Sequence, residues 1–312
     1  MATRYDVIVV GAGAAGLTAA IYLARSRFKT LVLDHGAAGG QLNLTHEVAN
    51  YPGVLSTSGA ALGRTMRSQA QSFGARILSQ AELLRFDLAG PEKSFEVDDE
   101  GTFTAPAVIL ATGGLPRTLG LAAEQRLKGR GISYCATCDG DFFTGKDIAV
   151  IGGGNSALEE AVSLTRYARS VKLIHEFDRF QAYAWAVEEA RNNPKISFLL
   201  EQTVTDFRGD ESLEAVVSVH KRTGETTVTP AAGAFLFIGY VPNTKWLEGL
   251  VALDERGQIV TDDALRTSLP GVFAAGDARV KRYRQITTAV ADGTVAALAA
   301  AEYVGSLVRS AA

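Results

Sequence analysis

The same short pattern occurs twice in this chain, and it constrains the fold more than any other feature. An apolar run rich in β-branched residues leads into a glycine-rich turn, a segment with helical spacing and a second apolar run. The first copy reads YDVIVV (5–10), GAGAAG (11–16) and TLVLD (30–34), and the second reads DIAVI (147–151), GGGNSA (152–157) and VKLIH (171–175). A shift of 141 positions superposes the two copies without a gap: Gly11 falls on Gly152, Gly13 on Gly154, Gly16 on Ala157 and Asp34 on His175. The chain therefore contains two strand-helix-strand openings of one design.

Each glycine turn stands between a buried strand and a helix, which is the context that a dinucleotide-binding fingerprint requires. The first glycine permits a tight turn, the second lets the backbone approach a pyrophosphate, and the third, or an alanine, lets the helix pack on the strand. The helix N-terminus favours the negative charge of the phosphates. Asp34 ends the second strand of the first copy, where it can accept hydrogen bonds from ribose hydroxyls. That site favours a nucleotide without a 2′-phosphate, such as FAD or NAD.

The Gly- and Pro-rich segments of the chain predict that one domain is inserted into the other. Two apolar runs, within 104–117 and 233–244, end in glycine and are followed by clusters of Gly and Pro, as segments that cross between domains would be. We expect residues 1–115 and 245–312 to form a discontinuous FAD-binding domain and residues 116–244 to form the second nucleotide-binding-like domain. The predicted fold class is α/β, with two Rossmann-like nucleotide-binding domains, the second inserted into the first.

Composition excludes several other classes of function. The 312 residues are 47% hydrophobic and 21% charged, and the net charge of -3 gives no electrostatic footprint for nucleic acid or an anionic membrane. No apolar run approaches the length of a transmembrane helix, and no cationic-then-apolar leader precedes the first strand, so a cytoplasmic location is expected. The chain has two cysteines, Cys135 and Cys138, and no second cysteine pair that would complete a zinc site. We therefore expect no metal.

The two cysteines lie in YCATCDG (134–140). A CxxC pair spaces two sulfurs closely enough for a disulfide, and such a pair commonly forms a redox couple. Asp139 adjoins Cys138 and is a candidate to move protons to and from the thiols, although an Asp before Gly is also typical of a turn. A flavin beside a dithiol is chemically sensible, because both exchange two electrons.

Together these residues resemble the low-molecular-weight thioredoxin reductases, a branch of the FAD-dependent pyridine nucleotide-disulfide oxidoreductases. The likeness covers almost the whole chain and is carried by eight motifs in order. They are GAGAAGLTAAIYLAR (11–25), GGQL (39–42), NYPG (50–53), ATG (111–113), CATCDG (135–140), GGGNSALEEA (152–161), GVFAAGD (271–277) and RQITTAVADG (284–293).

The resemblance implies functional residues for both domains. The catalytic residues it implies are Cys135, Cys138 and Asp139. The FAD-binding residues are Gly11, Gly13, Ala14, Ala15, Gly16, Asp34, Gly40, Gln41, Leu42, Asn50, Ala111, Thr112, Gly113, Gly276, Asp277, Arg284, Gln285 and Ile286. Among them, Asp277 would bind the ribityl chain, and Gln285 and Ile286 would offer backbone donors to the flavin. The second nucleotide would contact Gly152, Gly154, Asn155, Ser156, Ala157, His175 and Glu176. The resemblance also implies a homodimer and a thiol or disulfide partner, either thioredoxin, another protein or a small dithiol.

The chain departs from the family where the NADPH-using members carry three arginines. The matching positions here are Glu176, Phe177 and Gln181, following His175. Arginines at these positions grip the 2′-phosphate of NADPH, and a carboxylate at Glu176 would repel it. NADPH is therefore an unexpected donor.

Three alternatives remain open at the second site. It can hold a second FAD, supported by the aromatic residues Phe177, Phe180, Tyr183 and Trp185, although aromatics at this spacing are also typical of a helix core. It can accept NADH, with Glu176 reading the ribose. Electrons can instead come from a protein such as ferredoxin, docked on the basic cluster RVKRYR (279–284), which is equally typical of a solvated loop. A redox-inert flavin-binding sensor is the alternative from a different class of function.

Overall fold

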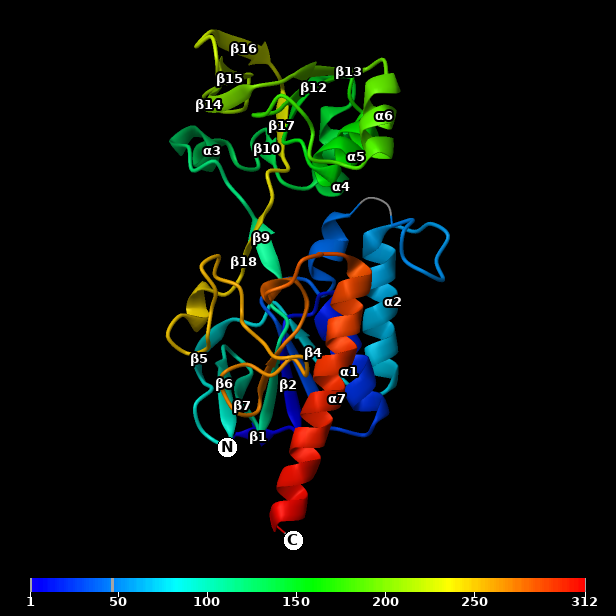
Figure 1. The fold of residues 1–312 in the computed structure, drawn as a ribbon, viewed down its shortest axis with the longest axis vertical. Helices are drawn as coiled ribbons and strands as arrows, with labels where there is room; N and C mark the ends of the chain where they lie inside the picture. Colours follow the sequence, from blue (N-terminus) through cyan, green and yellow to red (C-terminus); the bar gives the residue numbers. More distant parts are fainter. Residues whose placement is uncertain (1, 46–47, 312) are drawn as a thin grey trace. The chain divides into compact units, whose positions relative to one another are not determined.

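The computed structural model describes residues 2–45 and 48–311, apart from the side chains of residues 137, 138, 308, 310 and 311. The chain divides into two compact units (Figure 1). Unit 1 comprises residues 1–115 and 241–312, and unit 2 comprises residues 116–240. The chain crosses between them in two short strands that pair with each other, β9 (Gly114–Pro116) and β18 (Tyr240–Pro242). The return crossing lies before the expected boundary at 244–245.

Unit 1 is built on a parallel sheet whose strand order is β19-β8-β2-β3-β4. Its strands are β2 (Val7–Val10), β3 (Thr30–Asp34), β4 (Arg76–Ser79), β8 (Ala107–Leu110) and β19 (Val272–Ala274). The strands β2 and β8 are buried along their whole length, because layers cover both faces of the sheet. This burial explains why both strands are continuous apolar runs in the sequence.

Helices cover one face of this sheet: α1 (Ala14–Arg25), α2 (Gly59–Ser72) and α7 (Ile286–Ala311). Figure 1 shows α1 beside α7. A Cβ on Gly293 of α7 would overlap the carbonyl oxygen of Ala15 in α1, so glycine is required for this close approach. A second sheet packs on the other face, in the order β1-β7-β6-β5. Its strands are β1 (Thr3–Arg4), β5 (Leu83–Asp87), β6 (Lys93–Val97) and β7 (Gly101–Ala105).

Unit 2 repeats the parallel architecture with the order β10-β17-β11-β12-β13. Its strands are β10 (Ile132–Ser133), β11 (Asp147–Ile151), β12 (Ser170–Ile174), β13 (Ile196–Leu199) and β17 (Gly233–Leu236). An antiparallel sheet joins β14 (Gln202–Arg208), β15 (Ala215–His220) and β16 (Thr226–Pro230). The helices are α3 (Ala122–Leu127), α4 (Ala136–Asp139), α5 (Asn155–Leu164) and α6 (Ala184–Asn192). The two parallel sheets confirm the predicted α/β class.

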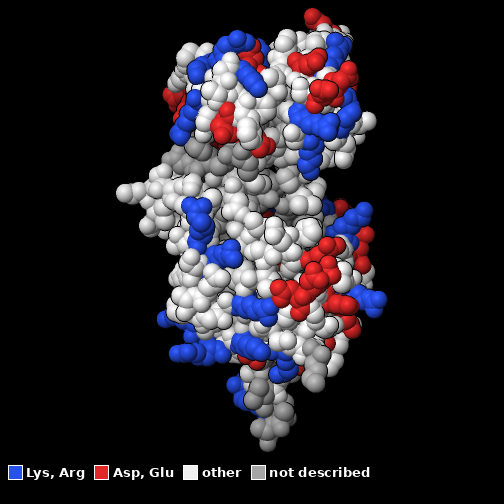
Figure 2. Space-filling model, turned by 180° about the vertical axis from the view of Figure 1, so that it is seen from behind, with Lys and Arg blue, Asp and Glu red and all other residues white. Residues whose placement is uncertain are grey.

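Short 3-10 turns complete the chain: η1 (Gly40–Leu44), η2 (Gly140–Phe143), η3 (Lys245–Leu247) and η4 (Gly276–Ala278). None of the helices in the described part of the chain combines the length and hydropathy that a membrane span requires. Basic and acidic side chains are both present on the face shown in Figure 2, where neither sign covers the surface alone. This mixture agrees with the small net charge of -3.

Candidate active site

The first glycine turn has the geometry of a dinucleotide cradle. Gly11 has a φ of +106°, and a Cβ there would overlap the carbonyl oxygen of Ala111. A Cβ on Gly16 would overlap the carbonyl oxygen of Gly11, so the helix α1 approaches the turn as closely as backbone allows. By contrast, a Cβ on Gly13 would meet no atom within 4 Å. The first and third glycines are thus required by packing, whereas the second faces open space that a ligand can enter.

The carboxylate of Asp34 is fixed at the end of β3 by backbone donors. Its Oδ2 accepts from the N–H of Ala12, and its Oδ1 accepts from the N–H of Gly36 at 2.7 Å. These bonds orient the carboxylate beside the glycine turn and leave further lone pairs on both oxygens. Asp34 can therefore accept from ribose hydroxyls without rearrangement.

Three buried polar atoms among the predicted FAD-binding residues have no hydrogen-bond partner in the described structure. They are Oε1 of Gln41, Oγ1 of Thr112 and Oδ1 of Asp277. Burial raises the pKa of Asp277, while Lys281 and Arg284 act in the opposite direction. Unpaired buried polar atoms are rare in folded proteins and cost free energy. These three fit a cofactor rich in hydroxyl and amide groups, so the residues present fit FAD.

The other predicted FAD-binding residues lie at the carboxyl ends of strands or at the helix starts that follow them. They are Ala14 and Ala15 in α1, Gly40 and Leu42 in η1, Gly113 after β8, Gly276 in η4, and Arg284, Gln285 and Ile286 at the start of α7. Asn50 Nδ2 donates to Gln285 Oε1 at 3.3 Å. The N–H of Gln285 donates to Thr288 Oγ1 at 3.1 Å at the helix start, and its role as a donor to the flavin stays a prediction.

The second glycine turn repeats this geometry in unit 2. Gly152 has a φ of +139°, and a Cβ there would overlap the carbonyl oxygen of Phe237. A Cβ on Gly154 would meet only the carbonyl oxygen of Gln181, at 3.9 Å. Asn155 begins α5, and its Oδ1 accepts from the N–H of Tyr183 at 2.7 Å. The cradle therefore exists in both units, with Ser156 exposed and Ala157 buried behind it.

His175 takes the place that Asp34 has in the first copy. The residue is 5% exposed, its ring lies against Gly153, and its Nε2 is 3.1 Å from the carbonyl oxygen of Arg179. Burial lowers the pKa of His175, which favours the neutral imidazole. The sequence interpretation missed the role of Gly153. The signal was present, since the middle one of three consecutive glycines, Gly153, stands where the first copy has Ala12.

Glu176 is exposed and paired with a residue that the sequence did not indicate. Its Oε2 lies 3.5 Å from Nζ of Lys221, which follows β15, and this ammonium also stands 5.0 Å from the ring centre of Phe177. An exposed ion pair of this kind contributes little to stability. It does, however, offset the negative charge at Glu176, so the repulsion of a phosphate is weaker than the sequence alone suggests.

The aromatic residues after β12 divide into two groups. Phe180 is partly buried and packs against the core of unit 2, and its ring is stacked on His175 at 5.7 Å between centres. Phe177, Tyr183 and Trp185 are 43%, 57% and 55% exposed. Tyr183 stands beside the start of α5 through its bond to Asn155. Three of the four rings are therefore accessible from solvent.

The redox motif begins in unit 2 at the end of β10. Cys135 is 7% exposed and is held in a disulfide, and the side chain of Cys138 lies outside the described residues. The hydroxyl of Ser133 accepts from the N–H of Cys135 at 3.0 Å and donates to its carbonyl oxygen at 3.2 Å. The N–H of Asp139 donates to the same carbonyl oxygen at 3.3 Å. Cys135 is thus fixed in a short, hydrogen-bonded segment.

Tyr134, the residue that precedes this cysteine, is held in place by Glu124. Its hydroxyl donates to Oε1 of Glu124 at 2.5 Å, and burial together with this bond raises the pKa of Tyr134. Glu124 is 2% exposed and also accepts from the N–H groups of Leu119 and Gly120. These contacts tie the redox motif to the segment that follows the crossing strand β9.

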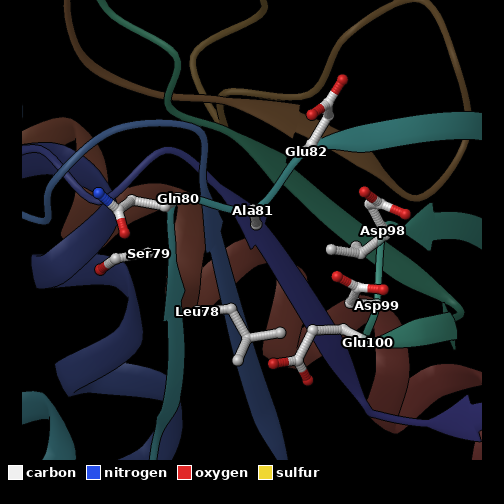
Figure 3. Close-up of a pocket in the computed structure, with 9 residues that line it drawn as sticks. Leu78, Ser79, Gln80, Ala81, Glu82, Asp98, Asp99 and Glu100 are labelled. Carbon is white, nitrogen blue, oxygen red and sulfur yellow. The ribbon is translucent and has the colours of Figure 1, made fainter.

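A separate pocket of about 300 Å³ lies in unit 1 between the end of β4 and the turn joining β6 to β7. Figure 3 shows Glu82 set apart from Asp98, Asp99 and Glu100. Within the described ranges, no three His, Cys, Asp or Glu side chains are grouped so as to hold a metal ion. Four carboxylates line this pocket: those of Glu82, Asp98, Asp99 and Glu100.

Comparison with known proteins shows the family of this chain. Residues 5–293 match the family model described as pyridine nucleotide-disulphide oxidoreductase. The chain belongs to this family. It is 43% identical to a thioredoxin reductase of Peptoclostridium acidaminophilum over 311 residues, which cover 97% of this chain and 98% of that protein.

Two solved thioredoxin reductases of the family have the same fold. The Lactococcus lactis structure is 40% identical with a TM-score of 0.92, covering 97% of this chain and 99% of its own. The T. acidophilum structure is 37% identical with a TM-score of 0.91, with the same shares covered. The chain is thus an FAD-dependent disulfide oxidoreductase of thioredoxin-reductase type, as the sequence predicted.

Proposed function

We propose that the flavin exchanges electrons with the Cys135–Cys138 couple, which passes them to or takes them from a thiol or disulfide partner. The disulfide at Cys135 carries this proposal, because it lies in the motif on which the family's dithiol chemistry depends. Reduction breaks the S–S bond, and each sulfur gains one electron and one proton. FAD supplies the two-electron chemistry when bound. Asp139 is placed to carry a proton, since it follows Cys138 directly.

Thioredoxin is the partner that the names of the relatives indicate, and it is the first substrate to test. The relatives of Peptoclostridium acidaminophilum and Lactococcus lactis both carry that name. Cys135 is 7% exposed, so its disulfide is buried and must become accessible before it can react with a protein partner. Small dithiols, which need less space, are the second class to test.

The donor proposed for the second site is a dinucleotide without a 2′-phosphate. The cradle at Gly152 and Gly154 supports a pyrophosphate, whereas Glu176, Phe177 and Gln181 provide no guanidinium for a further phosphate. The three exposed aromatic rings favour a second FAD over NADH, because a flavin offers a large ring for stacking. Lys221 pairs with Glu176 and does not replace the three arginines.

A protein donor such as ferredoxin is the alternative, and the structure gives it less support than the sequence did. Two members of the basic cluster 279–284 are engaged inside unit 1: Arg279 and Lys281 pair with Asp292. The remaining cations, Arg282 and Arg284, are exposed. A docking surface built from these two alone would be small.

The proposal for the dithiol is tested with Cys135→Ser and Cys138→Ser, each loaded with FAD and assayed with thioredoxin and with a small dithiol. Both variants should lose the exchange to background. Asp139→Asn should slow it by about a hundredfold, as removal of a general acid-base group does. Asp141→Asn, two residues further on, is the matched control and should keep the wild-type rate. A cysteine variant that exchanged electrons at the wild-type rate would overturn the proposal. A flavin spectrum that dithiols left unchanged in the wild type would favour a redox-inert flavin sensor.

A further inference from the structure

Asp292 of α7 gathers three donors from one short segment of unit 1. Its Oδ2 accepts from the N–H of Gly276 at 3.1 Å and from Nζ of Lys281 at 2.8 Å, and its Oδ1 lies 3.4 Å from Nη1 of Arg279. The side chains of Lys281, Asp292 and Arg279 are 7%, 14% and 18% exposed. This is a largely desolvated cluster, in which removal of one charge leaves buried partners unpaired.

The three donors flank Asp277, whose Oδ1 is buried without a partner. Gly276 precedes Asp277 directly, and Arg279 and Lys281 follow within four residues. Gly276 is also confined sterically: its φ is +77°, and a Cβ there would stand 2.9 Å from Cβ of Ala15 at the first glycine turn. Asp292 therefore fixes the backbone on one side of Asp277 and the cations on the other.

The electrostatics of the cluster have a consequence for Asp277. Lys281 and Arg284 favour the charged form of Asp277, and Asp292 disfavours it. With Asp292 present, Lys281 has a carboxylate partner at 2.8 Å. Without Asp292, Asp277 would be the nearest remaining carboxylate on that segment, and an ion pair with Lys281 would occupy the oxygen that is now unpaired.

We propose that Asp292 is a positioning residue for FAD: by holding Gly276, Arg279 and Lys281, it keeps the Asp277 carboxylate available to hydroxyl groups of the cofactor. The same side chain stands on the helix that begins at Ile286, so it joins two of the segments that would contact FAD. The inference depends on FAD binding by unit 1 and not on the donor at the second site or on the dithiol.

The test measures FAD affinity of Asp292→Asn, which keeps the size of the side chain and removes its charge. FAD is removed from each purified protein and titrated back by flavin fluorescence, and unfolding is followed in parallel with and without FAD. We expect Asp292→Asn to bind FAD about tenfold to a hundredfold more weakly, the loss expected for a charge-assisted hydrogen-bond cluster. The absorbance spectrum of its bound flavin should also shift. Asp292→Glu should restore most of the affinity.

Two further variants separate positioning from general destabilisation. Lys281→Met also breaks the cluster but leaves no cation to capture Asp277, so it should weaken FAD binding less than Asp292→Asn. Glu100→Gln removes the exposed Arg76–Glu100 pair in the same unit and should change FAD affinity by no more than about twofold.

Wild-type FAD affinity and spectrum in Asp292→Asn would overturn the inference, as would equal losses in Asp292→Asn and Lys281→Met. Should Asp292→Asn fail to fold, Lys281→Met still tests the inference, because a loss of FAD affinity of about a hundredfold in this variant, which has no cation to capture Asp277, would overturn it. Failure here leaves the dithiol proposal intact, because that proposal is judged by electron exchange in the Cys135 and Cys138 variants.

Discussion

The imidazole of His175 lies against Cα of Gly153, in space that any side chain at position 153 would need. In the first copy of the repeat the equivalent contact is a hydrogen bond from the Ala12 N–H to Asp34. The same backbone position therefore meets a small carboxylate in unit 1 and a ring in unit 2, and the residue type changes from alanine to glycine accordingly.

We expect Gly153→Ala to lower the stability of the protein by about 1–3 kcal/mol, because overpacking forces the buried ring or the turn to move. Gly154→Ala is the matched control, since its Cβ would meet only one oxygen at 3.9 Å. It should keep the wild-type unfolding temperature yet lose affinity for a dinucleotide at the second site, where the ligand needs that space. Thermal unfolding and ligand titration of both variants check this prediction. Equal unfolding temperatures for Gly153→Ala and the wild type would contradict the packing of His175.

The missing arginines predict a gain of function. Glu176→Arg with Phe177→Arg would place two guanidiniums after β12, and Lys221 would then lack its carboxylate partner and add a third cation. We expect NADPH to bind at least about tenfold more tightly to this double variant than to the wild type, with little change for NADH. Calorimetric titration with both nucleotides measures the ratio. An NADPH affinity that did not increase would show that the 2′-phosphate of NADPH does not reach these positions.

Asp277 predicts a pH dependence of stability. Its pKa is raised above the unfolded value of 3.8, so the folded protein binds more protons than the unfolded chain between the two values. This group therefore makes the cofactor-free protein less stable as pH rises from about 4 through the folded pKa, after which its effect is constant. Asp277→Asn lacks the effect. The stability of the variant relative to the wild type should increase over that window and then level, while its FAD affinity falls. Urea unfolding across pH measures the difference, and a difference that shrank with rising pH would contradict the assignment.

The sequence predicted the features that are encoded locally. The two glycine turns, the strands that lead into them and the α/β class follow from spacing within about 30 residues, and the structure shows the same segments. The inserted order of the domains followed from clusters of Gly and Pro near 113 and 239, where β9 and β18 cross.

Side-chain contacts between segments that are distant in the sequence could not be predicted from local patterns. Lys221 reaches Glu176 from the antiparallel sheet, and Asp292 reaches back from α7 to Lys281, so neither pairing leaves a periodic trace in the sequence. The basic cluster at 279–284 therefore suggested an exposed patch, although two of its cations are engaged by Asp292. The hydrogen bond from the Gln285 N–H to Thr288 likewise left no signal in the sequence, because it depends on the geometry of the helix start.

We propose that this family member reacts with dithiols through a flavin and that NADPH is not its electron donor. Anaerobic titration of the FAD-loaded protein, with the flavin-to-chain ratio measured first, tests it directly. We expect a dithiol to bleach the flavin and stoichiometric NADPH to leave it oxidised, with a ratio near two if the second site holds FAD. Rapid bleaching by stoichiometric NADPH would contradict the account.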